Sequence, residues 1–168
     1  MAVTDGQAPV WDAQLARARI DALATLPGAL LPILHALHDE FGYIDDAAIP
    51  LITDALNLSR ADVIGVIHFY HDFRMEPPGR HILRVCRAEA CQSMGSERLV
   101  EHLEQTAGTS IGETTADRRL TLENVYCLGN CALSPAIMLD GRLYGRITPE
   151  RIDALLTGVE DRVVGGVR

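Results

Sequence analysis

The chain has 168 residues, of which 48% are hydrophobic, and a formal net charge of −8 at pH 7. This length fits one domain, or one compact domain with a small extension, and the apolar fraction suffices for a hydrophobic core. The negative charge argues against a nucleic-acid partner, and no apolar run approaches the roughly 18 residues that a membrane-spanning helix requires.

Residues 1–77 are predicted to be helical. Apolar residues recur at helical spacing in four stretches, over residues 11–22, 30–41, 49–56 and 63–70. Because four such short helices can bury their apolar faces against one another, we predict a small N-terminal helical bundle.

Several residues are expected to set the ends of these helices. Gly42 should end the second helix, and either Asp45 or Asp46 should cap the third. Ser59 and Asp62 are spaced as a capping box, which predicts the start of the fourth helix.

The sequence Glu76-Pro77-Pro78-Gly79 marks a break, after which the periodicity changes. Strands are predicted over residues 81–86, 120–126, 136–139 and 142–146, and helices over residues 93–107 and 149–156. An Asp140-Gly141 turn should join the last two strands into a hairpin, and Thr148 should cap the last helix. The order β, α, β, β, β, α fits a reduced thioredoxin-like α/β domain over residues 78–168, so the whole chain is predicted to be α+β.

Four cysteines lie in two close pairs, Cys86-x4-Cys91 and Cys127-x3-Cys131, with 35 residues between the pairs. Four thiolates can hold one zinc ion or one iron–sulfur cluster. A structural zinc site usually contains a Cys-x2-Cys pair, and neither pair here is that close. In a [2Fe–2S] cluster each iron takes two thiolates, and gaps of three and four residues allow each pair to bind one iron. The spacing therefore favours a [2Fe–2S] cluster over zinc and over four unrelated buried cysteines.

Two structural disulfides are a further alternative, and they would require an oxidising compartment. Residues 1–10 lack the character of a signal peptide, so we expect a cytoplasmic protein with free thiols.

Each cysteine pair begins where a predicted strand ends, and loops at strand ends can converge at one edge of a sheet. We therefore expect Cys86 and Cys91 to bind one iron, and Cys127 and Cys131 to bind the other. An oxidised cluster with four thiolates is a dianion, so the surrounding groups must offset negative charge.

Several residues near the cysteines are candidates for offsetting the negative charge of the cluster. Gly129 allows a close approach of backbone N–H groups to a sulfur, and a helix beginning near Ser93 would present its positive N-terminal end. Arg84 and Arg87 flank the first cysteine and could tune the reduction potential, although ordinary surface placement is the simpler interpretation. Pro135 follows the second pair, and a trans turn proline is favoured there over a cis proline.

Some motifs are missing from the sequence. It has no Gly-x-Gly-x-x-Gly after a strand, no P-loop and no Cys-x-x-Cys. We therefore expect no flavin, NAD or molybdenum site in this chain. A one-electron cluster alone cannot oxidise NADH or formate, which are hydride donors, so the chain must work beside subunits that do that chemistry.

The segments GVIHFYHDFRMEPPGRHILRVCRAEACQSMG and VYCLGNCALSPAIMLDGRLYGRITPERID resemble the thioredoxin-like [2Fe–2S] subunit of NADH dehydrogenases, the family of the small [2Fe–2S] subunit of complex I. The resemblance covers about residues 30–156. Within this family, CRAEACQSMG and TTADRRLTLENVYCLGNCALSPA look most like the gamma subunit of soluble NAD-dependent formate dehydrogenases.

The resemblance implies a non-catalytic electron-transfer subunit that carries one [2Fe–2S] cluster. Its partners would be a flavoprotein subunit that binds FMN and NAD, and a formate dehydrogenase subunit that contains molybdenum or tungsten. The alternatives are the equivalent subunit of complex I or of an NAD-reducing hydrogenase, a free-standing [2Fe–2S] redox sensor, and a zinc-stabilised interaction module.

Overall fold

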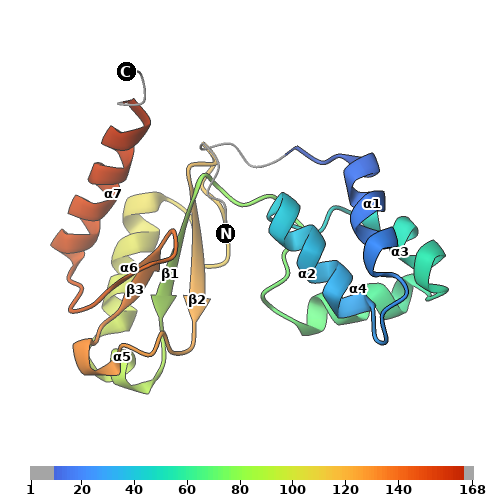
Figure 1. Ribbon diagram of the computed structural model, residues 1–168. Coiled ribbons are helices and arrows are strands. Elements are labelled where there is room, and N and C mark those ends of the chain that lie inside the picture. The colour runs from blue at the N-terminus through green and yellow to red at the C-terminus, as the bar shows by residue number, and fades with distance from the viewer. Residues whose placement is uncertain (1–9, 165–168) are drawn as a thin grey trace. The chain divides into compact units, whose positions relative to one another are not determined.

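A computed structural model describes residues 10–164, with residues 159–164 described by their backbone only. The chain divides into two compact units between Pro77 and Pro78 (Figure 1). Helices in both units and a four-stranded sheet in the second confirm the predicted α+β class. Over residues 10–164, no helix is long and apolar enough to cross a membrane.

The first unit contains one helix for each stretch with helical periodicity. These helices are α1 (Ala13–Leu23), α2 (Leu30–Phe41), α3 (Ala48–Leu56) and α4 (Arg60–Phe69). Gly42 ends α2 in the left-handed conformation, at a φ of 76°. The capping box of α4 is present, because Ser59 N–H donates to Asp62 Oδ2 (3.0 Å) and Asp62 N–H donates to Ser59 Oγ (3.1 Å).

The expected cap of α3 is wrong. Asp45 Oδ1 instead accepts a hydrogen bond from the N–H of Ala47 (2.8 Å), in the turn before the helix. Ala47 takes the cap position, and its side chain makes no capping hydrogen bond. The short side chain of Asp45 therefore stabilises the approach to α3 rather than its first turn.

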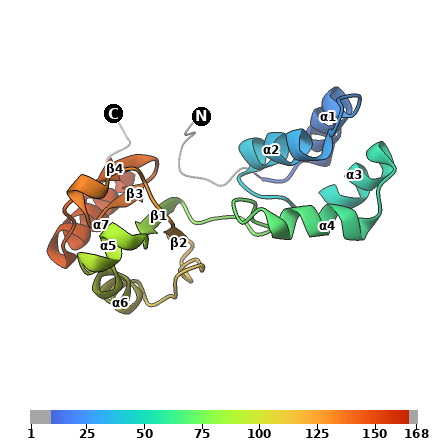
Figure 2. The same cartoon turned by 90° about the horizontal axis from the view of Figure 1, so that it is seen from below.

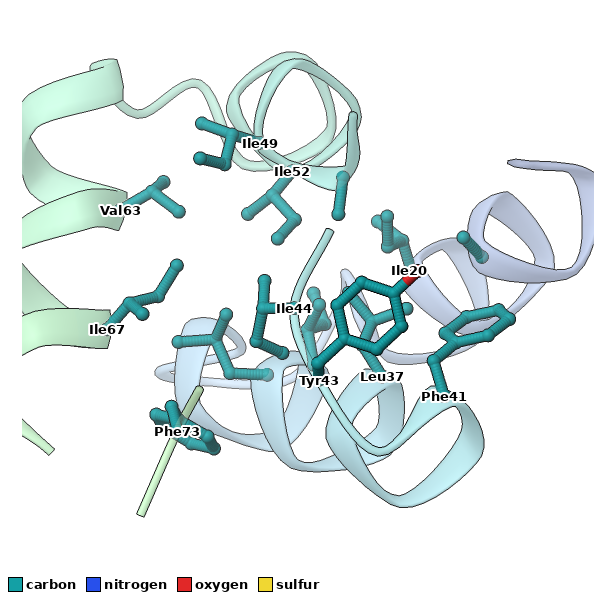
Figure 3. Packing of buried hydrophobic residues seen from close by; sticks show 14 of the residues in the cluster. Ile20, Leu37, Phe41, Tyr43, Ile44, Ile49, Ile52, Val63, Ile67 and Phe73 are labelled. Carbon is teal, nitrogen blue, oxygen red and sulfur yellow. The ribbon is translucent and has the colours of Figure 1, made fainter. Parts of the chain in front are cut away.

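The core of the first unit is formed by side chains from all four helices. Ile20, Leu37, Ile52 and Ile67, one from each helix, are buried. Ile44, from the connection between α2 and α3, lies in the middle of the labelled side chains in Figure 3. Each fully buried aliphatic side chain contributes about 1.5–3 kcal/mol, so this shared core stabilises helices that would be marginal alone.

The second unit is built on a four-stranded sheet with the order β2-β1-β3-β4. The strands are β1 (His81–Cys86), β2 (Leu120–Val125), β3 (Ile137–Leu139) and β4 (Arg142–Tyr144). β1 and β2 are parallel, whereas β3 is antiparallel to both β1 and β4. Asp140 and Gly141 have φ values of 48° and 78°, which is the left-handed geometry of the predicted two-residue hairpin turn.

One face of this sheet is apolar and covered by helices. Leu83 and Val85 of β1 are buried with residues of α6 (Ser96–Ala107) and α7 (Pro149–Val164), which lie on the same side of the strands in Figure 2. The opposite face carries an ion pair between Arg84 and Glu123, 2.8 Å apart. The alternation of side chains along β1 therefore places apolar residues on the core face of the sheet and Arg84 on the opposite face.

Two helices of this unit differ from the prediction. α6 begins at Ser96, three residues after the start of the helix expected over residues 93–107. A separate helix that was not predicted, α5 (Glu89–Ser93), precedes it, and Gly95 lies between the two with a φ of 90°. α7 continues to Val164 instead of stopping at Leu156, and Thr148 Oγ1 accepts from Arg151 N–H at 3.4 Å, as a cap does.

Candidate iron–sulfur site

The two cysteine loops leave the sheet at the same edge. Cys86 is the last residue of β1, and its register partner on the parallel strand β2 is Val125. Cys127 follows two residues later, so parallel pairing brings both loops to one end of the sheet. In Figure 1 the arrowheads of β1 and β2 point toward that end, where α5 also lies.

The first pair is buried. Cys86 and Cys91 are each only 2% exposed, and they pack against Ala136. Cys91 lies inside the short helix α5, whereas α6 begins at Ser96. The expectation of a helix N-terminus near Ser93 is therefore wrong, because the helices on either side of that position begin at Glu89 and Ser96.

Backbone N–H groups do surround the Cys86 sulfur. It accepts hydrogen bonds from the N–H groups of Ala88, Leu128 and Cys127. Burial raises the pKa of the Cys86 thiol, but these donors together with the Cys91 thiol outweigh it and leave the pKa below its usual value. Burial dominates at Cys91, whose pKa is raised. Because two of the three N–H donors belong to the second loop, Cys86 bridges both loops.

The second pair is exposed. The sulfur atoms of Cys127 and Cys131 are 3.7 Å apart. Two sulfurs on one tetrahedral metal, with bonds of about 2.3 Å, would be about 3.8 Å apart, so this pair already has the required separation. Gly129 N–H donates to the Cys127 sulfur at 3.4 Å. Donation of the Cys131 S–H to the Cys127 sulfur and the negative charge of that sulfur raise the pKa of Cys131.

The backbone of the second loop is unusual. Cys127 has a φ of 90°, which is rare for a residue with a side chain, and Gly129 has a φ of 74°. No atom would lie within 4 Å of a Cβ at Gly129, so glycine is favoured there by conformation rather than by space. A left-handed non-glycine residue costs about 1–3 kcal/mol and is concentrated at functional sites.

Ser134 connects the two pairs. Its Oγ lies 3.6 Å from the Cys91 sulfur, and its hydroxyl donates to the carbonyl of Cys131 at 2.7 Å. Among the described residues, no three Cys, His, Asp or Glu side chains converge as they would on a single metal ion. The four thiols instead stand as two pairs at one edge, with N–H donors between them, and this arrangement fits a group that takes two thiolates on each of two irons.

The two arginines near Cys86 are both paired with carboxylates. Arg87 forms a two-pronged ion pair with Glu97, with distances of 3.0 and 2.7 Å. Arg84 is paired with Glu123, its register partner on β2. Each positive charge is therefore largely offset, and Arg87 ties the end of β1 to the first turn of α6. Neither partner has a direct signal in the sequence, because both depend on how distant segments align.

Further supports of the second loop were not predicted. The Ser134–Pro135 bond is cis, whereas trans was favoured. A Cβ on Gly145 would lie 2.7 Å from Leu133 Cβ and 2.8 Å from its carbonyl oxygen. Arg146 N–H donates to the same carbonyl at 2.6 Å. Residues 145 and 146 therefore pack directly beneath the loop that carries Cys131, a contact between segments that no local pattern marks.

A cavity of about 140 Å³ lies elsewhere in the second unit. It is lined by His81 and Leu120, the first residues of β1 and β2, together with residues of α6 and α7. Because the cysteine loops follow the last residues of these strands, the cavity lies at the opposite end of the sheet.

Comparison with known proteins places the chain in a family. The profile of a family described as thioredoxin-like [2Fe–2S] ferredoxin matches residues 16–160. One subunit of the NADH-quinone oxidoreductase of Pseudomonas aeruginosa is 39% identical over 128 residues, which are 76% of this chain and 77% of that protein. The HndA subunit of the NADP-reducing hydrogenase of Solidesulfovibrio fructosivorans is 31% identical over 137 residues, covering 82% of this chain and 80% of that one.

A solved structure is also similar to this chain. A crystal structure of an NAD+-reducing [NiFe]-hydrogenase in the air-oxidised state matches 83% of this chain with a TM-score of 0.66 and 29% identity, although the match spans only 24% of that hydrogenase chain. From the extent of the profile match, the identity to the two relatives and the fit of the four thiols, we conclude that the chain belongs to the thioredoxin-like [2Fe–2S] ferredoxin family, whose members carry one [2Fe–2S] cluster.

Proposed function

We propose that this chain is a non-catalytic electron-transfer subunit of a multi-subunit, cytoplasmic, NAD-linked oxidoreductase. In this proposal Cys86 and Cys91 hold one iron of the [2Fe–2S] cluster, and Cys127 and Cys131 hold the other. The cluster, when bound, supplies a site that takes up and releases one electron. The chain's own residues bind it, offset its negative charge with backbone N–H groups, and keep water from one side of it.

The observation that carries this proposal is the contrast between the two pairs at one sheet edge. Cys86 and Cys91 are buried, whereas Cys127 and Cys131 are exposed. A site enclosed on one side and open on the other is suited to electron exchange with a partner protein that docks on the open side. Tyr126 is 72% exposed beside Cys127. A docked partner would bury this apolar surface together with the open pair.

The partner proposed for this face is a flavoprotein subunit that binds FMN and NAD. The chain offers no nucleotide-binding motif, and a one-electron site needs a cofactor that divides a hydride into single electrons. The relatives support such an assembly, since their names describe subunits of an NADH-quinone oxidoreductase and of an NADP-reducing hydrogenase.

For the parent enzyme we propose an NAD-dependent formate dehydrogenase whose catalytic subunit contains molybdenum or tungsten. This assignment rests on the segments around the cysteines, CRAEACQSMG and TTADRRLTLENVYCLGNCALSPA. The named relatives favour a second candidate, the equivalent subunit of complex I or of an NAD-reducing hydrogenase.

We propose that the two units have different roles. Residues 78–168 form the thioredoxin-like domain that holds the cluster. Residues 1–77 form a helical bundle that serves assembly, because this unit contains none of the four cysteines and has 11 acidic residues against 4 Arg.

The test is anaerobic purification of the tagged chain from its native host, followed by metal and sulfide analysis. We expect two irons and two labile sulfides per chain, with a paramagnetic signal after one-electron reduction. NADH, formate and H2 are then offered separately to the purified assembly. Reduction by formate identifies the formate dehydrogenase, and reduction by H2 or by NADH alone identifies the second candidate. A chain that purifies without partners is a free-standing redox protein, and a colourless protein with stoichiometric zinc would overturn the proposal.

A further inference from the structure

Ser134 lies between the two cysteine pairs and is almost buried, at 9% exposure. Its Oγ is 3.6 Å from the sulfur of Cys91. The same hydroxyl donates its hydrogen to the carbonyl of Cys131 at 2.7 Å. That carbonyl also accepts the backbone N–H of Ser134 at 3.3 Å. It would therefore keep a hydrogen-bond partner if the hydroxyl turned away.

The direction of the contact between Cys91 and Ser134 depends on the form of the sulfur. As a thiol, Cys91 donates its S–H to Ser134 Oγ. As a thiolate ligand of a metal it has no proton to donate and can only accept. The serine hydroxyl, by contrast, can both donate and accept, and it rotates to suit its neighbours. Rotation about one bond would direct its hydrogen toward the Cys91 sulfur.

The surroundings strengthen this interaction. Cys91 is 2% exposed, so little water competes for its sulfur. A hydrogen bond in such a low-dielectric site is electrostatically stronger than one in water, and hydrogen bonds to charged acceptors are the stronger class. Hydrogen bonds to the sulfurs are among the levers that set the reduction potential of an iron–sulfur cluster.

We propose that Ser134 donates a hydrogen bond to the Cys91 sulfur in the cluster-bound protein, and thereby raises the reduction potential of the cluster. The inference rests on the proposed function, because it requires Cys91 to be a ligand. Reduction adds one negative charge, part of which is carried by the ligand sulfurs, so a donor at Cys91 stabilises the reduced form more than the oxidised form. Ser134 touches no iron in this scheme and acts through Cys91, as a positioning residue.

The test is a redox titration of the full-length, cluster-bound chain, followed by electron paramagnetic resonance. Ser134→Ala removes the hydroxyl, and Ser134→Thr retains it. Ser93→Ala is the matched control, because Ser93 lies in α5, two residues after Cys91, but its hydroxyl donates to the carbonyl of Ala90 at 2.9 Å.

We expect Ser134→Ala to make one-electron reduction about tenfold less favourable, a shift of about 59 mV toward negative potential. Ser134→Thr and Ser93→Ala should stay within about twofold of the wild type. An unchanged or more positive potential in Ser134→Ala would overturn the inference.

If Ser134→Ala fails to hold a cluster, a high-resolution structure of the cluster-bound wild type decides. In a neutron structure that locates the Ser134 hydroxyl hydrogen, a hydrogen directed at the Cys91 sulfur supports the inference, and one directed at the Cys131 carbonyl overturns it. The proposed function has a separate readout. If Cys91→Ala keeps the wild-type iron content and spectrum, the ligand assignment fails. If the cluster is present but Ser134→Ala leaves its reduction potential unchanged or makes it more positive, the inference alone fails.

Discussion

Gly145 offers a sharp test of how the ligand loop is supported. A methyl group on this residue would lie 2.7 Å from Leu133 Cβ, 2.7 Å from Asn130 Nδ2 and 2.8 Å from the Leu133 carbonyl oxygen. The Asn130 side chain can turn aside, but the other two atoms are fixed to the backbone between Cys131 and Ser134. Gly145→Ala should therefore displace that backbone by several tenths of an ångström or more.

Such overpacking typically costs about 1–3 kcal/mol. In a domain of this size each kcal/mol lowers Tm by roughly 4–8 °C. We expect Gly145→Ala to lower the stability of the second unit by about 1–3 kcal/mol, which corresponds to about 4–24 °C in Tm. It should also reduce the iron content, because the loop that carries Cys131 moves. The assay is thermal unfolding of the full-length chain followed by circular dichroism, with visible absorbance reporting the cluster.

The matched control is Gly158→Ala, which lies in α7 and has no atom within 4 Å of the added methyl group. There alanine should leave the stability unchanged or raise it by up to about 1 kcal/mol, since alanine favours helices over glycine. If Gly145→Ala unfolded at the wild-type temperature and kept its full iron content, the proposed packing of the loop would be refuted.

Three other predictions concern the ligands, a helix cap and the first unit. Replacing any one of the four cysteines with alanine should abolish the wild-type visible spectrum and lower stability. Replacement with serine should retain an altered cluster at some positions, because oxygen can also bind iron. A cysteine whose alanine variant keeps the wild-type iron content would not be a ligand. Hydrogen bonds from Ser59 hold the pKa of Asp62 below its usual value, so its carboxylate stabilises the first unit above the ordinary pKa, and this stabilisation is lost as pH falls through the folded pKa. The stability difference between wild type and Asp62→Asn, measured by hydrogen exchange in α4, should accordingly disappear on acidification, and a difference that persists in acid would contradict the cap's role. Residues 78–168 expressed alone should keep the [2Fe–2S] spectrum but bind the flavoprotein at least tenfold more weakly, whereas full-strength co-purification would rule out an assembly role for residues 1–77.

The sequence predicts the parts of the fold that short-range chemistry determines. β1 matches its predicted bounds, the Asp140-Gly141 turn has the expected left-handed geometry, and Ser59 caps α4. In each case the decisive residues are neighbours in the chain. Where two local solutions compete, prediction fails, as at Asp45, whose side chain accepts from the turn before α3 instead of from the helix.

The environment of the cysteines was harder to predict, because it is made by contacts between distant segments. The partner of Arg84 depends on the register of β1 against β2, and the partner of Arg87 on where α6 begins. The short helix α5 was not predicted, and Gly95, with a φ of 90°, separates it from α6. The role of Gly145 is set entirely by the packing of Leu133 against it. A sequence pattern indicates which side chains bind, but the groups that hold them in place belong to the tertiary structure.

The contrast between the two cysteine pairs also bears on how a cluster would enter and leave the protein. Cys86 closes the central strand of the sheet and Cys91 lies in α5, so their positions are fixed as soon as the second unit folds. Cys127 and Cys131 are exposed and lie on the segment between β2 and β3. Under the proposed ligation, insertion would end at this outer pair, and damage by oxygen or chelators would begin there. A partner docked on the open side would then extend the lifetime of the cluster as well as exchange electrons with it, so that the isolated chain would lose iron faster than the assembled enzyme.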